Sequence, residues 1–196
     1  MYIEKIDKDK YTSIDCSMPV KKVSRYAGII TLPFYILYTA VYLLRWDYAN
    51  IFVTLFKGTF LFLLELFILA FAVIAVQIVS LLIKGTLLSY VSEGKWDNIK
   101  FKMLSENQKP YLTVDEPLKV SQYRRAQLAY VVCFAVLPFL IAFIIGDFMF
   151  VFASYICVLI AGSDILLLFS LFKQNRESYI IDYNGMYLYK IFNRKQ

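Results

Sequence analysis

AQLAYVVCFAVLPFLIAFIIGDFMFVFASYICVLIAGSDILLLFSLF, residues 126–172, is the stretch of this sequence that decides the fold. It contains two apolar runs that are separated only by Gly146 and Asp147. Each run reaches the roughly 20 residues that a helix needs to cross a bilayer core. We therefore predict a tight hairpin of two membrane-spanning helices over 126–145 and 148–172, the first of them interrupted by Pro138.

Two further spans precede this hairpin. The first covers 26–44 and is free of charge, with Arg45 directly after it. The second lies in the apolar run 51–83, which as one straight helix would be about 50 Å long and exceed the bilayer core. We place its membrane part from about residue 58, with 51–57 at the interface or the helix tilted. The predicted fold is mainly α: four transmembrane helices with small cytoplasmic β-hairpins.

The composition agrees with a membrane protein. Hydrophobic residues make up 60% of the 196 residues, against about 45–50% in soluble domains. The chain has no histidine, which excludes His-zinc sites and Ser-His-Asp triads. Two of its three cysteines, Cys133 and Cys157, lie inside apolar runs, where they behave as small hydrophobic residues.

The basic residues indicate the orientation of the spans. Of the 21 lysines and arginines, 19 lie before the first span, between the second and third, or after the fourth. By the positive-inside rule, these three regions are cytoplasmic. The predicted organisation is a cytoplasmic N-terminal segment 1–25, a membrane domain 26–172 with a β-hairpin insert at 95–120, and a cytoplasmic tail 173–196. The predicted location is the cell membrane, crossed several times with both termini in the cytoplasm.

The net charge of the chain also indicates its binding partners. The net charge of +6 comes without a recognisable nucleic-acid module, so we expect no nucleic acid. The expected partners are the lipid bilayer, anionic lipid headgroups near the basic regions, and another membrane protein.

Two short regions favour β-strands. Residues 98–104 alternate polar and apolar side chains, and 110–114 are β-favouring, which predicts a hairpin with its turn at 105–109. In the tail, Asn184-Gly185 lies between the β-rich runs 178–182 and 186–190, a strong signal for a second hairpin. We expect the two hairpins to pair, or to lie together on the membrane surface.

Acidic residues inside the predicted spans are candidate functional residues, because charge is costly in the bilayer. They are Glu65 in the second span and Asp164 in the fourth. For Glu65 the alternatives are a structural carboxyl near one end of the span, protonated or paired with Lys57, and a functional role. Ala153, Cys157 and Ala161 recur every four residues before Asp164 and permit close helix approach, so we expect Asp164 at a helix contact, in a structural or a functional role.

Several stretches resemble a known family in their order and spacing. They are Ile99-Lys100-Phe101, Pro110-Tyr111-Leu112-Thr113-Val114-Asp115-Glu116-Pro117-Leu118-Lys119-Val120 and Ala161-Gly162-Ser163-Asp164. Together they are similar to the zincin-like peptidase family of bacterial polytopic membrane proteins. That family carries Gly-Ile-x-x-His-Glu-x-x-His-Gly in a membrane helix. The resemblance covers roughly residues 26 to 190 and implies a membrane-embedded zinc site.

The zinc-binding run itself is missing. Aligning 72–81 with the family pattern places Val76, Gln77 and Ser80 at the positions of its His, Glu and His. A zincin needs two imidazoles one helical turn apart and a carboxylate to activate water. Asp164 would then be a third ligand without the other two. We treat Val76, Gln77, Ser80 and Asp164 as vestigial zincin positions, and expect no metal or other cofactor.

Three functions remain open from the sequence. The first is a catalytically inactive zincin-like protein that keeps the fold for binding or assembly. The second is a small transporter or channel component that uses Glu65 and Asp164. The third is a membrane metallopeptidase with an atypical site.

Overall fold

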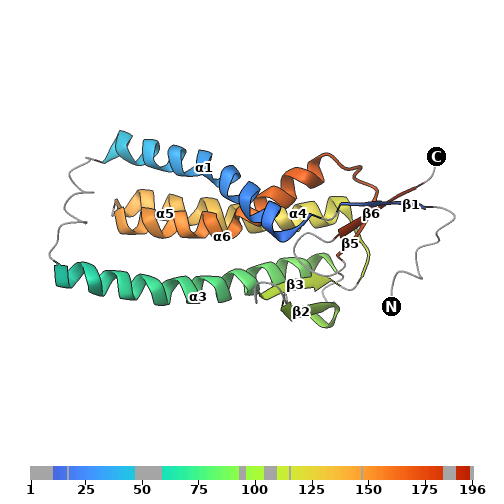
Figure 1. Cartoon of the computed structure of the whole chain (residues 1–196), viewed down its shortest axis with the longest axis horizontal. Coiled ribbons are helices and arrows are strands. Elements are labelled where there is room, and N and C mark those ends of the chain that lie inside the picture. The colour runs from blue at the N-terminus through green and yellow to red at the C-terminus, as the bar shows by residue number, and fades with distance from the viewer. Residues whose placement is uncertain are drawn as a thin grey trace.

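The computed structural model describes residues 11–16, 18–46, 59–92, 96–103, 110–114, 116–146, 148–182 and 189–194. Its helices are α1 (Val20–Arg45), α3 (Thr59–Val91), α4 (Val120–Val131), α5 (Leu137–Ile145) and α6 (Phe148–Phe172). Its strands are β1 (Tyr11–Asp15), β2 (Ile99–Met103), β3 (Pro110–Val114), β4 (Leu118–Lys119), β5 (Tyr179–Asp182) and β6 (Tyr189–Arg194). The helices lie side by side, and the strands gather at one end of the bundle (Figure 1).

Four helical segments are long and apolar enough to span a membrane. Among the described residues they are Lys21–Arg45, Val73–Val91, Val120–Ile145 and Met149–Phe172. The mainly α membrane fold is therefore confirmed. Helix α3 continues past the apolar run 51–83 for two more turns, to Val91. The extension brings Lys84 into the helix.

Pro138 lies next to a π-helical turn, Val132–Val136, that joins α4 to α5. Proline has no N–H, so the carbonyl of Phe134 cannot form the usual helical bond four residues on. The wider turn accommodates this defect. The phenol of Tyr38 in α1 donates a hydrogen bond to the nearby carbonyl of Ala135 at 2.8 Å, which ties α1 to the irregular turn.

The predicted tight hairpin after α5 is present at Gly146. This residue ends α5 with φ +79°, a left-handed conformation that glycine adopts without strain. The phenol of Tyr42 donates to its carbonyl at 2.9 Å, and the indole of Trp46 donates to the carbonyl of Phe143 at 3.0 Å. The end of α1 thus holds the turn between α5 and α6 in place.

Helix α6 lies at the centre of the bundle and contacts α1, α4 and α5 extensively. Cys157 and Ala161 are buried in the largest core cluster, as the small-residue spacing predicts. On the side toward α1, a Cβ at Gly162 would lie 2.8 Å from Cγ2 of Thr31 and 3.3 Å from the carbonyl oxygen of Ala27. The α1–α6 contact is therefore close because glycine is there.

The sheets confirm both hairpins but correct how they associate. Strands β2 and β3 form a separate two-stranded sheet, whereas the tail strands β5 and β6 belong to a four-stranded sheet of order β1-β6-β5-β4. The prediction that the two hairpins pair is wrong, because β6 pairs with the N-terminal strand β1 and β5 with β4. Strand β6 is described from Tyr189 onward, and residues 183–188, which include the predicted turn Asn184-Gly185 and the predicted strand start at 186, lie outside the described residues.

Candidate functional site

A buried ion pair joins α3 to α6. The ammonium nitrogen of Lys84 lies 2.5 Å from Oδ1 of Asp164, and the two side chains are 12% and 5% exposed. Asp164 therefore lies at a helix contact, as expected from its small neighbours. A buried charge is tolerated only when it is paired, so each of these residues depends on the other.

A hydrogen bond joins α3 to α4 one helical turn away. The hydroxyl of Ser80 and the phenol of Tyr130 lie 2.6 Å apart, and both side chains are buried. The ammonium of Lys84 also lies 5.8 Å from the centre of the Tyr130 ring, within the range of a cation–π contact. Ser80, Lys84, Tyr130 and Asp164, which we call the Lys84 cluster, thus connect three helices.

Gln127 adds another buried polar side chain on α4. It is 1% exposed, and its amide nitrogen has no hydrogen-bond partner among the described residues. Gln127 lies one turn from Tyr130, on the side toward the strands. Near it, Arg124 donates to the carbonyls of Leu171 and Gln174 and so satisfies the end of α6.

The positions on α3 that the sequence resemblance aligns with the zinc-binding run have different environments. Ser80 is buried, Val76 is half-buried against the largest core cluster, and Gln77 is exposed. Val76, Ser80 and Lys84 follow one another every four residues and so share the inner face of α3. Of these three, Lys84 is the residue that contacts Asp164.

Glu65 does not share this location. The structure describes its backbone, which belongs to α3, but not its side chain. Nineteen residues separate it from Lys84, which is about 28 Å along a helix at 1.5 Å per residue. The structure therefore does not bring residue 65 and Asp164 together.

Lys84 is the site residue that sequence reasoning missed. It directly follows the apolar run 51–83, so the sequence predicts that it lies in the cytoplasmic segment between the second and third spans. The available signal was its spacing of four residues from Ser80, which places both side chains on one helical face. An aspartate in another span was the obvious residue to pair with such a lysine.

This set of residues does not fit a zinc ion. Zinc takes thiolate, imidazole and carboxylate ligands, whereas Ser80 offers a hydroxyl and Lys84 a charged ammonium. No three Cys, Asp or Glu side chains gather within the part of the chain that the structure describes. Chemically, the arrangement neutralises the Asp164 carboxylate and links α3, α4 and α6 through polar contacts.

Comparison with known protein families, with curated proteins and with solved structures gives no match for this chain.

Proposed function

We propose that this chain is a non-catalytic multi-pass protein of the cell membrane, with a zincin-like scaffold that serves binding or assembly and with both termini in the cytoplasm. The observation that carries the proposal is the buried contact between Lys84 and Asp164. A cation that bound this carboxylate would have to displace the ammonium. Lys84 would then remain charged and unpaired inside the bundle, at a cost of several kcal/mol.

The contact also favours a different alignment with the zincin-like family. Moving the family pattern one helical turn later places Ser80 and Lys84 at the two histidine positions and Leu81 at the glutamate. Gly85 then matches the glycine that ends the run. In this alignment Lys84 stands at the position of the second histidine ligand. Its ammonium also neutralises Asp164, the residue at the position of the third ligand. The earlier alignment puts the catalytic position at Gln77, whose side chain is exposed.

The two alternative functions have less support. A transport path through Glu65 and Asp164 would have to join positions about 28 Å apart along α3, and Asp164 is already paired. A metallopeptidase with an atypical site would need ligands beyond one carboxylate, and the residues around Asp164 supply a hydroxyl, a phenol and an ammonium.

Zinc content of the purified protein tests the proposal. The native chain should hold no stoichiometric zinc. The triple variant Ser80→His, Leu81→Glu, Lys84→His should bind about one equivalent, because two imidazoles one turn apart would then face Asp164. Adding Asp164→Ala to this variant should weaken zinc binding.

The matched control is the triple variant in the earlier alignment, Val76→His, Gln77→Glu, Ser80→His. It retains Lys84 on Asp164, so its zinc binding should not depend on Asp164. One equivalent of zinc in the native protein, lost on Asp164→Ala, would instead support the metallopeptidase.

The assembly role has its own test. In mild-detergent extracts of native membranes, the chain should migrate as a complex clearly larger than its 22.9 kDa protomer in detergent. Migration as a monomer under conditions that preserve known membrane complexes would contradict a binding or assembly role.

A further inference from the structure

We propose that the β2–β3 hairpin is a membrane-surface element, which inserts Trp96 and Phe101 into the interfacial layer of the same bilayer that α3 spans. The proposal requires that the helices span a membrane, and it does not depend on whether the chain is catalytic. It concerns a surface that the Lys84 cluster does not use.

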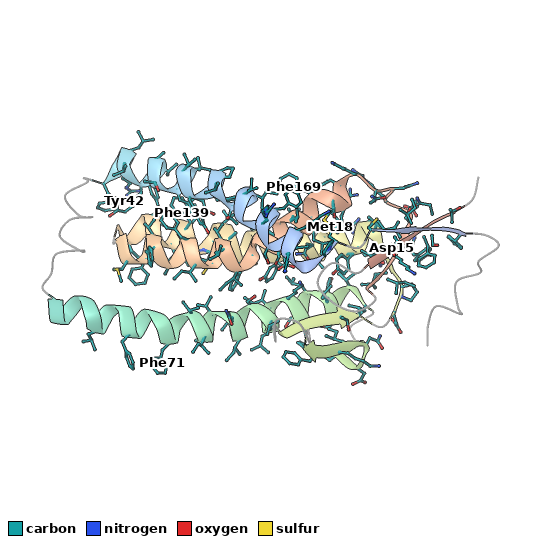
Figure 2. All side chains as sticks on the ribbon, in the orientation of Figure 1. Asp15, Met18, Tyr42, Phe71, Phe139 and Phe169 are labelled. Carbon is teal, nitrogen blue, oxygen red and sulfur yellow. The ribbon has the colours of Figure 1, made fainter. Side chains whose placement is uncertain are left out.

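The outer face of α3 carries a continuous apolar stripe. Phe67, Phe71, Ile74, Ile78 and Leu82 are each about half exposed or more and recur every three or four residues. Figure 2 shows Phe71 pointing away from the other helices. In a membrane-spanning helix such a face contacts lipid. Gly85 follows Leu82 by three residues and so continues the stripe toward the strands.

The hairpin meets this stripe at Gly85. A Cβ at Gly85 would lie 2.9 Å from the ring of Trp96 and 3.3 Å from Cδ1 of Leu112. Leu112 in β3 is directly opposite Phe101 in β2, so the two side chains lie on the same face of the hairpin. Trp96 and Leu112 therefore cover the stripe at Gly85, and Phe101 extends this apolar surface onto β2.

One face of the hairpin changes from buried to exposed along β2. Val114 is 2% exposed in the core near the bundle, and Ile99, its partner across the strands, packs against the same core. Phe101 lies on that same face two residues further along β2, yet it is 59% exposed, and Trp96 is 51% exposed. The apolar face thus continues past the protein core, in the direction of the lipid stripe.

Charged residues on two other helices mark the membrane boundary at this level. Ser80 contacts Tyr130 across the antiparallel helices α3 and α4. Gly85 and Arg125 each lie five residues from that contact, about 7.5 Å toward the strands. Arg125 is exposed. Exposed arginine is expected at the headgroups rather than in hydrocarbon.

Helix α1 indicates the same position for the membrane boundary. Its Ala27 lies beside Gly162 of α6. Two residues further toward the strands, α1 reaches Arg25, which is exposed, and α6 reaches Asp164, the partner of Lys84. The hairpin aromatics therefore lie where the headgroups begin, and tryptophan is enriched in that layer because its ring is apolar and its N–H is polar.

The experiment uses the full chain in phosphatidylcholine nanodiscs that carry a spin label at a shallow or a deep acyl position. Trp46→Phe leaves Trp96 as the single tryptophan. We expect a loss of Trp96 emission with both labels, larger with the shallow one, and little loss with aqueous acrylamide. Strong acrylamide quenching without lipid quenching would place the hairpin in water and overturn the proposal. Protection from both quenchers would mean a protein partner and would overturn it as well.

A matched pair of variants extends the test beyond Trp96. With Trp46→Phe and Trp96→Phe in place, Phe101→Trp moves the reporter to β2, and Ile14→Trp moves it to β1. Ile14 is 43% exposed, but it belongs to the four-stranded sheet. The lipid label should quench the reporter at 101 and not the one at 14. Equal quenching at both positions would reject a specific role for the hairpin.

Discussion

Helix α6 is held on its two sides by opposite kinds of contact. Toward α1 the backbones approach closely through Gly162, Ala27 and Thr31. Toward α3 the contact is the ion pair between Lys84 and Asp164. Lipid gives helices little hydrophobic reason to associate, so membrane bundles rely on small residues or on polar groups. This molecule uses one of these on each side of the same helix.

The two contacts should fail in different ways when they are changed. Close packing is sensitive to added volume, whereas an ion pair is sensitive to the loss of one partner and tolerant of the loss of both. The free energy of unfolding in detergent, measured by titration with a denaturing detergent, distinguishes the two kinds of failure.

The largest effect is expected at the ion pair. Lys84→Met or Asp164→Leu alone should destabilise the bundle by about 3–5 kcal/mol, because each leaves one buried charge without its partner. The double variant should recover most of the loss, since an apolar pair of similar volume removes both charges. Additive losses in the double variant would show that the two side chains do not interact.

Adding volume on the α1 side should have a smaller effect. Gly162→Ala should cost about 1–3 kcal/mol, because the new Cβ would collide with Cγ2 of Thr31. The Thr31 side chain cannot turn away freely, since its hydroxyl donates to the carbonyl of Gly28 at 2.8 Å. Thr31→Ser removes the colliding methyl group and should rescue the variant.

Gly28 provides the control for this prediction. It lies on α1 near the same contact, but a Cβ there would meet nothing within 4 Å. Gly28→Ala should leave stability unchanged or raise it by up to about 1 kcal/mol, from the better helix propensity of alanine. Equal losses from Gly28→Ala and Gly162→Ala would mean that close approach is not what holds α1 to α6.

The contrast also explains how much of the molecule the sequence could predict. The four helices follow from the length of the apolar runs, because bilayer thickness fixes how many residues must be apolar. The small residues before Asp164 correctly predict a helix contact. Their size can be read from the sequence without knowing which helix they meet. The hairpin Ile99–Met103 with Pro110–Val114 was likewise predictable from its alternation.

What could not be predicted depends on contacts between distant residues. Lys84 is 80 residues from Asp164 along the chain, so its place inside the bundle is not visible from the apolar run that it ends. The tail hairpin pairs through β6 with β1, where Ile14 lies opposite Ile191. A polar N-terminal segment gives no sign of such a pairing. The exposure of Gln77 likewise depends on which face of α3 meets α4.

The smallest expected effect comes from two hydroxyl pairs of the same chemistry. Ser80 and Tyr130 lie 2.6 Å apart between α3 and α4, and Thr39 and Tyr155 lie 2.6 Å apart between α1 and α6. Ser80→Ala should cost about 1–2 kcal/mol, because it leaves a buried phenol that is 1% exposed without this partner. Thr39→Val should cost less, since Tyr155 is only partly buried.

Tyr130→Phe and Tyr155→Phe separate the hydrogen bond from the packing of the ring. In the Ser80→Ala background, Tyr130→Phe should restore part of the lost stability, because it removes the hydroxyl that was left unpaired. In the Thr39→Val background, Tyr155→Phe should change little. Together these outcomes would show that the α3 side of the molecule depends on satisfying buried polar groups, and that the α1 side depends on shape. A larger loss at Thr39 than at Ser80 would reverse that assignment.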